Sequence, residues 1–180
     1  MTNNSATNHT VPAGLITHCT AIIRGHQDAD ITAHHARSGD ARLTMTWGGV
    51  LLTVYSAAAA HGLLDGFVAA RAAAAHLTRE IPPPATSYEA PFARPMVALE
   101  FTRRPAYAVV AHSGPAKSSD RVIHWVDVHM GPITWQIRDV AGLHSATELL
   151  HRAYLTAVAI FADGPAHADD PTADNHRLPA

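Results

Sequence analysis

Hydrophobic and polar positions alternate along short segments of this chain, and longer apolar runs separate those segments. Residues 42–47 and 50–55 alternate on either side of Gly48 and Gly49, and two glycines between alternating segments are typical of a tight β-hairpin. In the run 57–77 that follows, the large apolar residues recur at helical spacing. The pattern therefore predicts a hairpin followed by a helix.

The same order returns in the second half of the chain. Residues 121–130 and 133–139 predict another hairpin, and residues 146–161 predict another helix with one apolar face. Ser145 and Glu148 have the spacing of a capping box, in which each side chain accepts a backbone hydrogen bond at the start of a helix. We therefore expect the second helix to begin at this pair.

Two further strand-like segments precede each hairpin. They span residues 15–23 and 30–37 in the first half, and residues 96–104 and 106–113 in the second half. Each half then reads ββββα, and the alternation buries only one face of each strand, as in antiparallel sheets. The sequence predicts an α+β fold, with a duplicated ββββα unit and antiparallel sheets backed by two helices.

Composition divides the chain into five parts that form one pseudo-twofold domain. Asn, Thr and Ser dominate residues 1–12, five prolines interrupt residues 81–95, and residues 163–180 are acidic and contain few apolar side chains. We predict a disordered tail at 1–12, the first half at 13–80, a proline-rich linker at 81–95, the second half at 96–162, and a disordered acidic tail at 163–180.

In element order, the segment from residue 15 to residue 161 resembles the Whirly family of single-stranded-DNA-binding proteins, and each half is similar to the PC4 coactivator unit. The resemblance implies a sheet face that binds single-stranded nucleic acid. The second strands, at 30–37 and 106–113, contain no lysine, so the lysine-rich strand motif of that family has no counterpart here.

Charge and cysteine content restrict the class of protein. The formal net charge of −2 argues against a protein that holds duplex DNA by neutralising many phosphates. Between Arg37 and Arg152, however, eleven basic residues face nine acidic ones. The single cysteine cannot form an internal disulfide, and we see neither a signal-peptide profile nor a long apolar run. We therefore expect a cytoplasmic protein outside the membrane.

The strand 121–130 contains the strongest candidate for a binding residue. Trp125 shares a strand face with charged neighbours, which is an unusual environment for a tryptophan on a solvent-exposed face. One interpretation is a stacking platform for a base, with nearby basic side chains along the phosphates. The predicted binding residues are Arg103, Arg104, Lys117, Arg121, Trp125 and Arg138. The alternative interpretation is an aromatic residue buried in an oligomer interface.

The chain has 14 histidines, and three groupings could each offer two metal ligands. They are His26, Asp28, Asp30, His34 and His35 near the first turn, Asp127 and His129 on one strand face, and Glu148 and His151 on one helix face. Turn, cap or surface roles account for each grouping, so we predict no metal site.

Catalytic motifs are also missing from the sequence. Cys19 and His18 are adjacent in a predicted strand, so their side chains point to opposite faces. No nucleophile elbow or phosphate-binding loop is present, and we predict no cofactor and no catalytic residue.

We therefore expect a non-enzymatic, homo-oligomeric and regulatory binding protein. Its exposed sheet face binds single-stranded nucleic acid in the leading hypothesis. A protein-interaction or assembly module is the first alternative, and a metal-dependent enzyme that uses His and Asp residues is the second.

Overall fold

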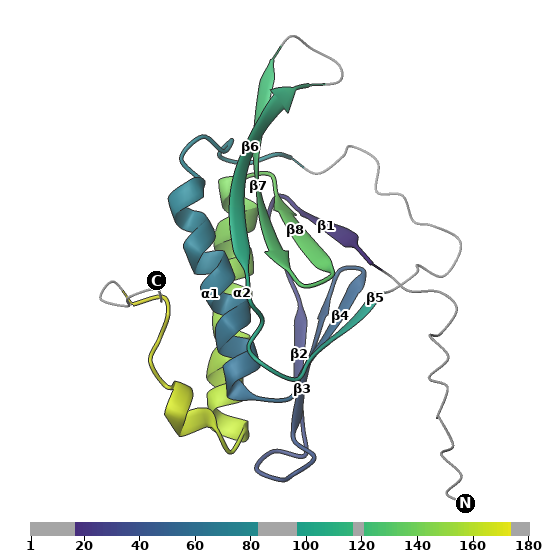
Figure 1. Cartoon of the computed structure of the whole chain (residues 1–180), viewed down its shortest axis with the longest axis vertical. Coiled ribbons are helices and arrows are strands. Elements are labelled where there is room, and N and C mark those ends of the chain that lie inside the picture. The colour runs from purple at the N-terminus through teal and green to yellow at the C-terminus, as the bar shows by residue number, and fades with distance from the viewer. Residues whose placement is uncertain (1–16, 83–96, 117–120, 174–180) are drawn as a thin grey trace, which may run out of the picture.

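The computed structural model describes residues 17–82, 97–116 and 121–173 and contains two four-stranded sheets and two long helices (Figure 1). The elements are β1 (Cys19–Ile23), β2 (Asp30–His34), β3 (Arg42–Trp47), β4 (Val50–Val54), α1 (Ala57–Ala73), β5 (Val97–Phe101), β6 (Ala108–Pro115), β7 (Val122–Met130), β8 (Ile133–Ile137), α2 (Val140–Ile160) and the short 3-10 helix η1 (Gly164–His167). This order confirms the predicted α+β fold with two ββββα units. Within the described ranges, no helix combines the length and apolarity needed to cross a membrane.

Each sheet takes its first strand from the opposite half of the chain. The first sheet has the order β1-β8-β7-β6, and the second sheet has the order β2-β3-β4-β5. β1 pairs in parallel with β8, and its counterpart β5 pairs in parallel with β4. Because both halves make the same exchange, the two sheets have equivalent strand topologies.

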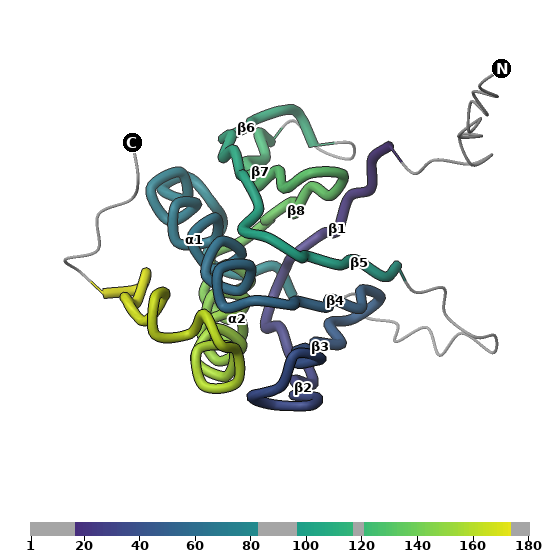
Figure 2. Tube along the Cα trace, turned by 60° about the horizontal axis from the view of Figure 1, so that its bottom comes forward, coloured from purple at the N-terminus to yellow at the C-terminus, as the bar shows by residue number. Residues whose placement is uncertain are grey.

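The parallel pairs are the feature of the sheets that the sequence did not predict. All other pairings are antiparallel, as expected from one-faced alternation. The parallel direction follows from the exchange, since a strand that joins the opposite half arrives through a long crossover connection. In Figure 2, β1 and β5 lie at the edges where the two sheets approach each other.

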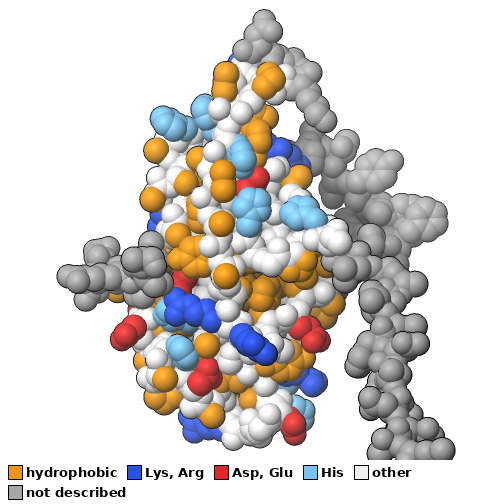
Figure 3. Space-filling model, viewed as in Figure 1, with side chains coloured by type: hydrophobic (Ala, Val, Ile, Leu, Met, Phe, Trp, Pro, Cys, Tyr) orange, Lys and Arg blue, Asp and Glu red, His pale blue; other side chains and the backbone are white. Residues whose placement is uncertain are grey.

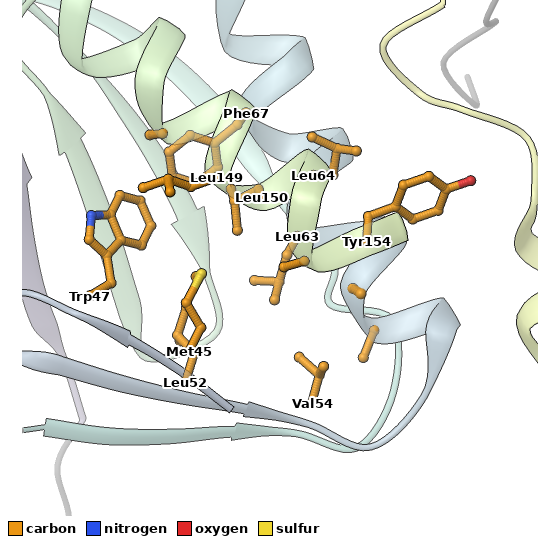
Figure 4. Packing of buried hydrophobic residues seen from close by; sticks show 14 of the residues in the cluster. Met45, Trp47, Leu52, Val54, Leu63, Leu64, Phe67, Leu149, Leu150 and Tyr154 are labelled. Carbon is orange, nitrogen blue, oxygen red and sulfur yellow. The ribbon is translucent and has the colours of Figure 1, made fainter. Parts of the chain in front are cut away.

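An aromatic cluster joins the two sheets beneath α1. The indole rings of Trp47 on β3 and Trp135 on β8 stack with 5.0 Å between ring centroids, and the Phe67 ring lies 6.0 Å from each. All three side chains are buried. Figure 4 shows Trp47 and its sheet neighbour Met45 pointing toward leucines of both helices. One continuous core therefore spans the two halves.

Helix α2 begins earlier than predicted, and the capping box prediction was wrong. Asp139 is the N-cap, and its carboxylate accepts a hydrogen bond of 2.7 Å from the Gly142 amide. Ser145 lies inside the helix, where its hydroxyl donates to the Ala141 carbonyl, and Glu148 is exposed. An aspartate immediately before the first helical turn is a sufficient cap.

Asp139 also ties three segments of the chain together. Its fully buried carboxylate accepts hydrogen bonds from the backbone amides of Gly25 after β1, Ile81 after α1 and Gly142 in α2, at 2.7–3.0 Å. These amides lie far apart in the sequence. The buried negative charge is thus satisfied by backbone donors, which a buried carboxylate requires.

The segment after α2 folds against both helices, which differs from the predicted disordered tail. The Asp163 carboxylate accepts hydrogen bonds from the amides of Ala57 and Ala58 at the start of α1. Farther along, the Tyr154 hydroxyl donates to the His167 carbonyl at 2.9 Å. An aspartate at a helix N-terminus is stabilised by the helix dipole. Residues 1–12, 83–95 and 174–180, where the two tails and the linker were predicted, lie outside the described residues.

We predict that Asp139→Ala lowers the free energy of unfolding by about 3–5 kcal/mol. A lost helix cap costs about 1 kcal/mol, and each buried amide left without an acceptor costs about 1–3 kcal/mol. Urea unfolding followed by circular dichroism measures the change. Asp40→Ala, at an exposed turn residue, is the control and stays within about 0.5 kcal/mol of the parent protein. A loss below about 1 kcal/mol for Asp139→Ala would contradict the structural role.

Candidate functional site

One face of the first sheet faces away from the helices, and we call it the open face. On β7, Val126, Val128 and Met130 point into the core, so Trp125 and Asp127 point the other way. Both helices lie on one side of the sheets (Figure 2), and no helix of the described residues covers the opposite side. Side chains from four strands therefore meet on a face that a ligand can reach.

A row of three side chains crosses the open face at Trp125. His112 on β6 is the register partner of Trp125, and the two rings stack with centroids 5.3 Å apart and planes inclined by 16°. On the other side, Arg138 places its guanidinium carbon 5.2 Å from the Trp125 ring centroid. The stacking contact with His112 and the cation–π contact with Arg138 fix the orientation of the indole ring.

A cluster of histidines and one carboxylate lies beside this row. The His112 Nε2 atom is 3.3 Å from Asp127 Oδ2, and one ligand atom from each of His112, Asp127 and His129 lies within 4.8 Å of the other two. The His129 Nδ1 atom is 2.8 Å from the hydroxyl of Thr134, the register partner of His129 on β8. Figure 3 shows histidine side chains around an acidic one in the region of β6 and β7.

A groove with two arginines lies at the other end of the Trp125 row. It has a volume of ≈ 270 Å³, and we call it the arginine groove. Its lining residues are Ile22, Arg24, Thr78, Ile81, Ile123, His124 and Arg138. Two guanidinium groups and no carboxylate line this groove, so its electrostatics favour an anion.

The structure brings together only two of the six predicted binding residues, Trp125 and Arg138. Arg121 is exposed immediately before β7, Arg103 is exposed in the turn after β5, and Lys117 lies outside the described residues. Arg104 has a structural contact, because its guanidinium pairs with the carboxylate of Asp65 in α1.

The Arg104 contact neutralises a fully buried charge. Asp65 has no exposed surface, and His61, one helical turn earlier, places Nδ1 3.1 Å from the same carboxylate oxygen. Burial raises the pKa of the neighbouring Tyr107 hydroxyl, and the negative charge of Asp65 raises it further, whereas Arg104 lowers it. Arg104 therefore stabilises the packing of α1 against the chain after β5.

Sequence reasoning missed His112 and Arg24. His112 joins Asp127 and His129 only through the register of β6 on β7, and the spacing along the chain does not reveal that register. Arg24 joins Arg138 because β1 crosses to the first sheet. The Asp127 and His129 pair did carry a sequence signal, since alternate residues of a strand share a face.

The other two histidine groupings come together without forming a ligand cluster. His26 and Asp28 share a cavity of ≈ 370 Å³ with Glu148 and His151. His151 there contacts Asp170 at 3.0 Å, and among the described residues the only potential metal-ligand group is His112, Asp127 and His129.

Comparison of the chain with protein-family models, curated proteins and solved structures finds no match. Its function is therefore inferred from the geometry of its own residues.

We predict that Arg104→Ala lowers the free energy of unfolding by about 2–3 kcal/mol, because it leaves the Asp65 carboxylate buried without its guanidinium partner. This value lies below that of a fully buried pair, since the Arg104 side chain is 39% exposed. Arg103→Ala is the matched control and is near neutral. A double-mutant cycle with Asp65→Asn checks the coupling, and additive losses would argue against a functional ion pair.

Proposed function

We propose that the open face of the first sheet binds single-stranded nucleic acid. The arginine groove beside the stacked row of His112 and Trp125 is the observation that carries this proposal. Proteins that bind single strands without strong sequence preference combine cationic groups for phosphates with aromatic rings for bases. The open face offers both in one continuous row.

In this proposal, Arg24 and Arg138 contact phosphates, and a base stacks on the aromatic row. Arg138 and His112 already contact the Trp125 ring. We therefore expect a base to stack on the outer side of the His112 ring on β6, since the His112 side chain is 37% exposed. Neighbouring strands lie about 4.8 Å apart, so the row extends about 10 Å from His112 to Arg138. That length suits a short stretch of extended single strand.

A protein partner is the second candidate, and exposed apolar side chains on the same face favour it. Ile22, Val110 and Ile123 are 58%, 40% and 39% exposed. Such residues on an otherwise polar face are typical of an interaction surface. The predicted homo-oligomer belongs to this candidate, with a second copy of the chain as the partner.

We predict that a labelled polythymidine oligonucleotide binds the protein at low salt and dissociates as salt increases, measured by fluorescence anisotropy. Arg24→Ala and Arg138→Ala each reduce the slope of log affinity against log salt by about 0.7, the value for one phosphate contact on a single strand. Trp125→Ala also weakens binding, because it removes the ring that holds His112 and Arg138 in position beside the base and the phosphates.

Arg42→Ala is the matched control, because Arg42 is an exposed arginine on β3 of the second sheet. It leaves the slope unchanged if the open face binds the strand. Absence of binding at low salt, or an equal effect of Arg42→Ala, would contradict the proposal. If Val110→Asp instead dissociates an oligomer in sedimentation velocity, the protein-partner candidate gains support.

A further inference from the structure

Two histidines and one aspartate on the open face each place one potential ligand atom within 4.8 Å of the other two. His112 comes from β6, and Asp127 and His129 come from β7. Imidazole nitrogen and carboxylate oxygen together form a ligand set that zinc prefers, with a fourth position left for water or a ligand. We propose that these three side chains bind one Zn²⁺ ion.

The spacing of the ligand atoms fits such an ion. In a tetrahedral zinc site with bond lengths of about 2.0–2.1 Å, two ligand atoms lie about 3.3 Å apart. The observed distance between His112 Nε2 and Asp127 Oδ2 is 3.3 Å. A ring nitrogen of His129 lies within 4.8 Å of one ligand atom of each of the other two side chains, so a small side-chain rotation of His129 completes the set.

Neighbouring side chains already orient both imidazoles. When His129 donates its Nδ1 proton to the Thr134 hydroxyl, at 2.8 Å, the lone pair of Nε2 is left to bind a metal. His112 is held by its stack on Trp125, with the ring planes inclined by 16°. Thr134 and Trp125 are thus positioning residues, which hold the ligands without touching the ion.

The carboxylate of Asp127 also lacks full compensation. Its side chain is only 13% exposed, and its Oδ1 atom is buried without a hydrogen-bond partner among the described residues. A buried carboxylate oxygen without a donor is costly. A divalent cation would stabilise the negative charge of Asp127. Backbone amides do the same for the buried Asp139 carboxylate.

This inference goes beyond the proposed binding of nucleic acid and does not depend on it. Zinc binding is measured without an oligonucleotide, and the variants that test it differ from the arginine variants. Either proposal can therefore fail alone.

The test is a zinc titration of the full chain, stripped with a chelator and carrying no polyhistidine tag, in competition with a chromogenic chelator. We expect one Zn²⁺ per chain and a dissociation constant of about one micromolar or lower. Asp127→Asn and His129→Gln should each weaken binding by about 100-fold or more. Mg²⁺ should not compete, because it prefers oxygen ligands.

His144→Gln is the matched control. His144 is an exposed histidine on α2, and its Nδ1 atom lies 3.6 Å from the Glu148 carboxylate. The substitution therefore removes a pair of a histidine and a carboxylate outside the proposed site. It should leave zinc affinity unchanged. Thr134→Val should weaken zinc binding about 10-fold and Thr134→Ser should restore it, a pattern that tests the positioning of His129.

Circular dichroism of each metal-free variant verifies that the chain is folded. A folded Asp127→Asn chain that binds zinc as tightly as the parent protein overturns the proposal. The proposal is also overturned if His144→Gln abolishes zinc binding, or if the parent protein does not bind zinc stoichiometrically.

Discussion

The exchange of first strands between the two halves is the constraint on which the rest of the structure depends. β1 lies in parallel beside β8, and β5 lies in parallel beside β4, so neither sheet is complete without the other half. The Trp47 and Trp135 stack then joins the sheets through one core. The same exchange builds the arginine groove, because Arg24 follows β1 whereas Arg138 follows β8. Fold and candidate site therefore share one cause.

Three carboxylates show how the environment assigns a role to the same kind of group. Asp139 is buried among backbone amides and joins three segments, and Asp65 is buried against Arg104 and His61. Asp127 lies on the open face between two histidines, with one oxygen unpartnered among the described residues. The carboxylates of Asp139 and Asp65 have their partners within the fold, so the Asp127 carboxylate is the one of the three that we expect to bind a ligand at the surface.

Local patterns in the sequence predicted the element order, because hairpins and amphipathic helices depend on residues that are near in the chain. Three features depend on pairings between segments that are distant in the chain, and hydrophobic periodicity does not reveal such pairings. They are the strand exchange, the position of Arg104 and the contact of His112 with Asp127. The predicted start of the second helix was wrong for another reason. Ser145 and Glu148 matched a capping motif, but Asp139 caps the helix six residues earlier and makes that motif an interior segment. Strand alternation did predict the face on which the Trp125 side chain lies, where Arg138 contacts it.

We propose that the open face of the first sheet is the functional surface. Backbone amide chemical shifts of the isotope-labelled chain, followed while an unlabelled oligonucleotide is added, test it most directly. The second sheet supplies an internal reference, because it has an equivalent strand topology without the Trp125 row. We expect shifts concentrated in β6, β7, β8 and residues 78–81. Shifts concentrated in β2, β3 and β4, or spread evenly over both sheets, would contradict it.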